Sequence, residues 1–180
     1  MTTERRARAP RPLLALWLAN VAAILALTLT GGPLRSGLLQ LAPEATTPLG
    51  WIALAALALA FVTWAFNHHR QVPLPRLAVA CVAVSAMLAW AWAIHLPSER
   101  MHLLLFGTLG VTASSALGLR AGLCFALAWA GIDELIQLGL PDRVADWTDV
   151  GLNAASATAG WLVVFAHRGG AHVRSDPSVT

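Results

Sequence analysis

The sequence predicts an all-α membrane protein, a polytopic bundle of about six transmembrane helices, from its composition and the spacing of its apolar segments. Of the 180 residues, 57% are hydrophobic and only 12% are charged, whereas a soluble domain usually carries about 25% charged residues. The mean hydropathy is +0.65. The apolar residues fall into six runs, each close to the about 20 residues that a helix needs to cross the hydrocarbon core.

The N-terminal part contains two of these runs. Residues 1–12 are Arg-rich and broken by prolines, and we expect them to form a disordered cytoplasmic lead. Residues 13–30 form the first apolar run. A basic start followed by an apolar stretch also describes a signal peptide, but this run is long for one and no clear cleavage site follows, so we expect a retained helix. A loop rich in Gly, Pro and Thr (31–49) precedes the second predicted span, 50–66.

Four further spans follow, and the connections between them are too short to hold a second folded domain. The first of the four closes with Trp90 and Trp92, whose rings suit the membrane interface. The predicted spans are 77–95, 102–118, 122–140 and 148–166, and a tail with Gly, Ser and Pro, 167–180, is expected to be disordered and cytoplasmic.

The distribution of Arg predicts the orientation, because cytoplasmic loops are enriched in basic residues. All twelve basic residues are Arg. With the N-terminus inside and six crossings, nine lie in cytoplasmic segments and three in outer ones. The outer three are Arg35, Arg100 and Arg143. Both termini are therefore predicted to lie on the cytoplasmic side.

Composition also excludes some functions. The formal charge of +3 does not indicate nucleic-acid binding, because no basic stripe is interleaved with aromatic residues. Cys81 and Cys124 are isolated within apolar runs and are interpreted as small hydrophobic fillers, with no pattern typical of a disulfide framework or a zinc site.

The least expected residues are two adjacent acids, Asp133 and Glu134, inside the fifth apolar run. A charge near the centre of a membrane helix costs roughly 2.5–3.5 kcal/mol on insertion scales, so such residues usually have a function. Gln137 follows at i+4 and i+3, on the same helix face, and can neighbour either acid. In the predicted topology, His102 and the loop residue Arg143 lie at the same, outer end of the bundle.

The sixth run adds a second polar stripe at that end. Asp149 and Asn153 are one turn apart near its start, and the small residues Ser156 and Gly160 continue the stripe, which we expect to pack against the fifth span. For Asp149 alone, capping of the helix N-terminus is as good an explanation as direct function. A purely structural network, with Arg143 pairing the acids, is the competing interpretation of the whole cluster.

This ordered set of motifs resembles the VanZ-like family, small bacterial membrane proteins associated with low-level resistance to the glycopeptide antibiotic teicoplanin. The motifs are His102 followed by LLLFGTLG, Asp133-Glu134-x-x-Gln137, Pro141-x-Arg143, and Asp149-x-x-x-Asn153 with Gly160 beyond it. The resemblance covers roughly residues 77–166, so residues 13–76, with two helices and their loops, look like an addition to the VanZ-like membrane domain.

Three departures from the family pattern concern loop geometry. Asp142 replaces a Gly in the usual Pro-Gly-Arg turn, Ser156 stands where a Gly often follows the Asn, and the basic residue common just before the His is shifted to Arg100. The resemblance implies a role in the cell envelope without supplying a reaction.

The first functional hypothesis is an outer-facing site that binds or modifies the polar head group of a lipid-linked glycan or cell-wall precursor. In an enzymatic form, Asp133 or Glu134 acts as the general acid or base and His102 as a second proton carrier. Gln137, Arg143, Asp149 and Asn153 would bind substrate, with Arg143 holding a phosphate. Carboxylates with His could alternatively hold a divalent metal, and no cofactor is indicated otherwise.

Two other classes of function remain open. Intramembrane acids are common in proton-coupled transporters, although these acids lie near one face and no inverted repeat is evident. A non-catalytic assembly subunit, whose polar cluster locks helix ends together, would instead lose stability when its charges are neutralised.

Overall fold

The computed structural model describes residues 10–41, 46–94, 97–141 and 146–173, and within these ranges it contains six α-helices and no strand. The predicted all-α fold is thus confirmed. The helices are α1 (Arg11–Leu41), α2 (Thr46–His68), α3 (Leu74–Ala93), α4 (Pro97–Leu117), α5 (Leu119–Leu138) and α6 (Trp147–Val173).

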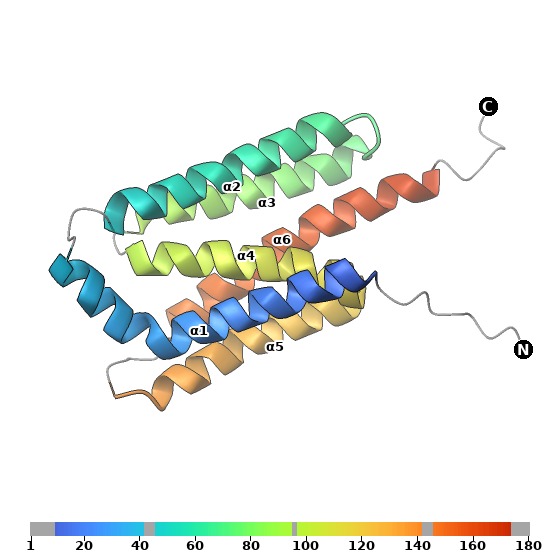
Figure 1. Ribbon diagram of the computed structural model, residues 1–180. Coiled ribbons are helices and arrows are strands. Elements are labelled where there is room, and N and C mark those ends of the chain that lie inside the picture. Colours follow the sequence, from blue (N-terminus) through green and yellow to red (C-terminus); the bar gives the residue numbers. More distant parts are fainter. Residues whose placement is uncertain (1–9, 42–45, 95–96, 142–145, 174–180) are drawn as a thin grey trace, which may run out of the picture.

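The helices lie side by side, with α4 in the middle of the bundle (Figure 1). Helix α4 packs against every other helix, most extensively against α6. The two termini leave the bundle at the same end, which also holds the α2–α3 and α4–α5 connections (Figure 1). At the opposite end, α1, α3 and α5 finish and α2, α4 and α6 begin.

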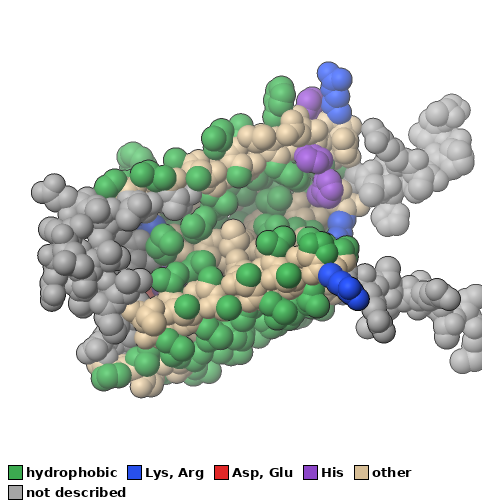
Figure 2. Space-filling model, viewed as in Figure 1, with side chains coloured by type: hydrophobic (Ala, Val, Ile, Leu, Met, Phe, Trp, Pro, Cys, Tyr) green, Lys and Arg blue, Asp and Glu red, His purple; other side chains and the backbone are tan. Residues whose placement is uncertain are grey.

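Four of the described helices contain a stretch long and apolar enough to cross a membrane. These stretches are Arg11–Thr30, Leu74–Ala93, Leu119–Leu138 and Trp147–Arg168. Helix α2 contributes a shorter apolar stretch, and α4 carries several Gly, Ser and Thr residues. Because its neighbours surround α4, this helix needs little lipid-facing surface. Figure 2 shows hydrophobic side chains covering one face between the two ends, as expected of a membrane protein.

Helices α1 and α6 extend furthest beyond the predicted spans. Helix α1 continues to Leu41 through part of the predicted loop 31–49, and its ribbon changes direction in that second half (Figure 1). Gly and Pro are tolerated in membrane helices and produce bends there. Helix α6 continues to Val173, so the first part of the predicted disordered tail 167–180 is helical. Arg168 in this extension donates to the carbonyls of Ser114 and Ser115 at the end of α4, which ties it to the bundle.

Glycine allows the central helix to approach its neighbours closely. A Cβ atom at Gly110 of α4 would lie closer than 3.0 Å to the Ala157 carbonyl of α6, and a Cβ at Gly160 would collide with the Gly107 carbonyl. A Cβ at Gly122 of α5 would meet the backbone of α4 in the same way. The small-residue stripe of α6 therefore packs on α4 rather than on α5, which corrects the sequence-based expectation, because the matching glycines are in α4.

Candidate functional site

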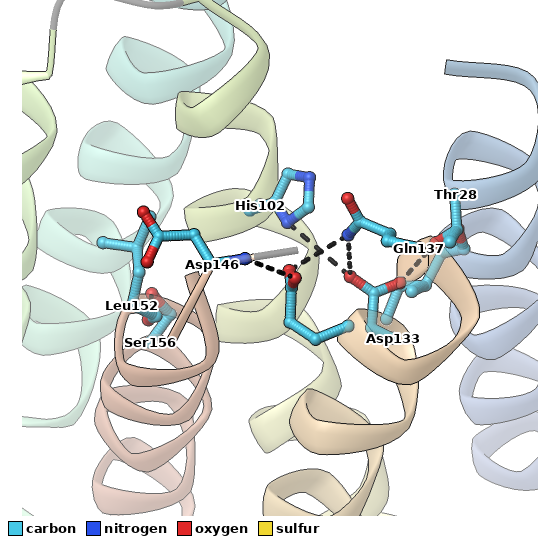
Figure 3. Close-up of polar contacts among 9 residues, drawn as sticks. Thr28, His102, Asp133, Gln137, Asp146, Leu152 and Ser156 are labelled. Carbon is cyan, nitrogen blue, oxygen red and sulfur yellow. Dashed lines mark hydrogen bonds and ion pairs between the residues drawn. The ribbon is translucent and has the colours of Figure 1, made fainter. Parts of the chain in front are cut away.

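The two acids of α5 are held by a glutamine one turn further along the helix. Asp133 and Glu134 are only 2% and 4% exposed. The Gln137 side-chain amide donates to Asp133 Oδ2 at 3.0 Å and to Glu134 Oε1 at 3.1 Å, as the i+4 and i+3 spacing predicts. A single NH₂ group therefore joins both carboxylates, and these residues face the bundle rather than lipid (Figure 3).

Helix α1 supplies a fourth member of the site that sequence analysis missed. The Thr28 hydroxyl is hydrogen-bonded to Asp133 Oδ1 and lies 2.9 Å from the Ile24 carbonyl of its own helix. Asn20, two turns earlier, donates to the hydroxyl of Thr108 on α4 at 2.6 Å. Polar side chains at 20 and 28 of an apolar run recur at helical spacing, which is the sequence signal for a buried polar face.

His102 approaches the same carboxylate from α4. Its Nδ1 atom lies 3.8 Å from Asp133 Oδ2, the one ion-pair distance recorded among the described residues. The ring stacks on Phe106 with centroids 6.3 Å apart, and Nδ1 is buried without a hydrogen-bond partner in the described parts of the chain. The side chain is 20% exposed, so His102 forms the more accessible wall of the site. Figure 3 shows His102, Asp133, Gln137 and Thr28 converging from three helices.

Asp146, the residue directly before α6, adds a contact to Glu134. Its backbone N–H donates to Glu134 Oε2 at 3.1 Å. Its own Oδ1 accepts hydrogen bonds from the N–H and the hydroxyl of Thr148, both at 2.9 Å, which is the geometry of a helix N-cap. These two hydrogen bonds lower the pKa of the exposed Asp146 carboxyl below its ordinary value of 3.8. Asp146 is therefore the N-cap residue of α6, and Asp149 lies within the first turn of the helix.

Replacing this cap should destabilise the protein. We expect Asp146→Ala to lower the unfolding temperature at neutral pH, because α6 loses its side-chain acceptor. Asp146→Asn should retain most of the stability, since its amide oxygen can accept the same bonds. The cap acts in its ionised form, so its contribution should persist above pH 3.8 and disappear as the pH falls through the lowered pKa. Thermal unfolding in detergent across this range measures both effects.

The hydrogen bonds described above do not include the remaining predicted site residues. Asp149 lies in the first turn of α6 and interacts electrostatically with Glu134. Asn153 is completely buried, and neither side-chain atom that can form hydrogen bonds has a partner among the described residues. No hydrogen bond joins Asn153 to the carboxylates in the described part of the chain. Arg143, with its turn, lies outside the described residues.

The chemistry of the site is that of buried acceptors. Glu134 experiences like-charge interactions with Asp149, Asp133 and Asp146. Such a cluster favours a ligand that brings hydrogen-bond donors or positive charge. Within the described ranges, no three His, Cys, Asp or Glu side chains come together as a metal site would require.

Comparison with known protein families gives a match over most of the chain. The model of the VanZ/LLP1 family matches residues 48–168, a range that includes α2 as well as the segment 77–166 expected from the sequence motifs. Neither the curated proteins nor the solved structures contain a match to the chain. The matched range includes the carboxylates and His102, and it leaves out α1 with Thr28.

Proposed function

This chain belongs to the VanZ/LLP1 family of membrane proteins, and from that premise we propose that its polar site binds the head group of a lipid-linked glycan or cell-wall precursor. The observation that carries the proposal is the Asp133–Glu134 pair, buried at one end of the bundle and joined by Gln137. Two carboxylates without a Lys or Arg within ion-pair distance among the described residues are poorly explained as a stabilising device.

The proposal places the protein in the bacterial cytoplasmic membrane, with both termini in the cytoplasm and the site facing outward. Arg and His side chains gather at the end of the bundle where the termini leave it (Figure 2). This asymmetry supports a cytoplasmic location for that end, by the positive-inside rule. The carboxylates lie near the opposite end, in the last turns of α5, and the proposal assigns that end to the outer leaflet, where head groups lie.

The chemical class of the ligand follows from the hydrogen-bond donors that it must present to the carboxylates. Sugar hydroxyls and ammonium groups, which are abundant in envelope precursors, donate to carboxylate oxygens. In an enzymatic form of the proposal, Asp133 or Glu134 acts as the general acid or base toward the bound head group, and His102, whose Nδ1 lies 3.8 Å from Asp133 Oδ2, is a second proton carrier. Arg143 remains the proposed phosphate-binding residue of the sequence analysis.

A binding experiment tests this proposal. Protein in nanodiscs would be titrated with a lipid-linked disaccharide-peptide precursor, alongside Asp133→Asn, Glu134→Gln and, as a matched control, Glu4→Gln in the N-terminal lead. Hydrogen bonds to charged groups contribute about 1.5–3 kcal/mol, so each site variant should weaken binding at least roughly tenfold while the control does not. Unchanged affinity in both site variants, with folding intact, would end the proposal.

A structural role is the second candidate, and one observation favours it. The hydrogen bonds of the site connect α1, α5 and the start of α6, and the His102–Asp133 pair adds α4, which is what a polar lock between helix ends would do. In that case the charge-neutral variants would lose stability rather than binding. No comparable observation favours the transporter, since the acids lie near one end of α5.

A further inference from the structure

A groove opens between α3, α4 and α6, on the side of the bundle away from α1. The cavity measures about 360 Å³, within the range typical of ligand pockets. Its lining is apolar except for the buried Ser156 and for Thr158. Buried residues at its base include Met87, Leu103 and Ala159, and exposed residues at its rim include Ala86, Trp90 and Ala155.

The groove lies within the membrane-spanning part of the bundle, so we expect a hydrocarbon chain to occupy it. Its walls belong to two of the candidate membrane spans, those of α3 and α6. A surface groove at that depth is exposed to lipid, where no water is available to fill it. An unfilled space would forfeit packing interactions with the atoms that line it. An acyl chain is the filler that the surrounding bilayer provides.

A buried cation lies beside this groove. The Arg100 side chain on α4 is 6% exposed, and its Nε and Nη2 atoms donate to the Ile94 carbonyl at 3.2 and 2.6 Å. Its guanidinium carbon lies 3.9 Å from the centre of the Trp51 ring. The remaining nitrogen, Nη1, is buried and has no acceptor, and no carboxylate among the described residues pairs with this side chain. Such a group is expected to bind an anion.

The cation and the groove are adjacent. Leu103, one turn after Arg100 on α4, lines the groove. Ile94, whose carbonyl accepts from Arg100, belongs to one hydrophobic cluster with Leu103, Met87 and Ala159 at the base of the groove. Trp90 at the rim and the exposed Trp92 further along α3 suit the membrane interface. A molecule with an apolar chain and an anionic head would therefore contact both features.

We propose that an anionic phospholipid binds here, with an acyl chain in the groove between α3 and α6 and its phosphate accepting hydrogen bonds from Arg100 Nη1. The charge of Arg100 selects the head group, and the small residues of α3 and α6 make room for the chain. This site is distinct from the carboxylate cluster, whose partners come from α1, α4, α5 and the start of α6.

The test compares two lipids with different head groups, anionic phosphatidylglycerol and zwitterionic phosphatidylcholine, whose choline cation balances the charge of its phosphate. Delipidated protein in neutral detergent would be titrated with phosphatidylglycerol and with phosphatidylcholine of identical acyl chains, with the unfolding temperature and native mass spectrometry as readouts. Phosphatidylglycerol should bind at least roughly tenfold more tightly, since the charge-assisted hydrogen bonds to Arg100 select the anionic head. Equal affinity of the two lipids would overturn the proposal.

Two variants test the cation and the groove separately, and a third is the control. Arg100→Gln should remove the preference for phosphatidylglycerol, and Ala86→Phe should weaken both lipids by filling the groove. Arg120→Gln, an exposed Arg at the start of α5, is the matched control and should leave the preference intact. If Arg100→Gln fails to fold, Arg100→Lys should retain the preference. A lipid-free dimer in the mass spectrum, or a preference that survives Arg100→Gln, would contradict the proposal.

Discussion

Adding a single methyl group at Gly110 or Gly160 is expected to destabilise the bundle strongly. A Cβ at either position would lie closer than 3.0 Å to a backbone carbonyl of the facing helix. Backbone cannot move aside as a flexible side chain can, so α4 and α6 would have to separate. Overpacking typically costs about 1–3 kcal/mol, and Gly110→Ala and Gly160→Ala should reach the upper end of that range.

Two other helical glycines provide the control. A Cβ at Gly131 of α5 or Gly151 of α6 meets nothing within 4 Å. There Ala should be neutral or stabilising by about 0.5–1 kcal/mol, because it is the better helix former. Unfolding temperatures in detergent, measured together with the amount of protein in the membrane, distinguish the two pairs. If all four variants behaved alike, close packing between α4 and α6 would not determine stability.

The fold could be predicted because membrane helices are recognised by apolar length, and all six predicted runs coincide with helices. Their ends could not be predicted by the same means. The sequence Gly31-Gly32-Pro33 would end a helix in water, yet α1 continues through it to Leu41. The central position of α4 was equally hidden, because its Gly, Ser and Thr content weakens the hydropathy signal that identifies a span.

Some contacts of the candidate site could likewise be predicted from the sequence, and others could not. The contacts of Gln137 with Asp133 and Glu134 follow from spacing within one helix, so they could be predicted. The contact of Thr28 with Asp133 joins residues 105 positions apart, and no spacing rule connects them. The same limit concealed Arg100, whose burial depends on Trp51 and the end of α3. Asp146 could have been recognised as a helix N-cap, because an Asp directly before the start of an apolar helical run is typical of that position.

Removal of Gln137 should reveal how much the acid pair costs the folded protein. We expect Gln137→Leu to lower the free energy of unfolding by about 1–3 kcal/mol or more, because both buried carboxylates lose a donor. Thermal or chemical unfolding in detergent measures this loss. Thr28→Val removes one donor from Asp133 alone and should have a smaller effect.

Glu134→Gln is the informative comparison, since a binding site and a structural lock predict opposite results. The variant loses one hydrogen bond, because the NH₂ group that replaces one carboxylate oxygen cannot accept, so either Gln137 or the Asp146 N–H loses its acceptor. It also relieves the desolvation of a buried charge and the repulsion from Asp149 and Asp133. These effects oppose each other, so its stability should remain within about 1 kcal/mol of wild type. A loss as large as that of Gln137→Leu would mean that the charge holds the helices together. Near-neutral stability combined with lost ligand binding would mean that the protein retains the charge for its function.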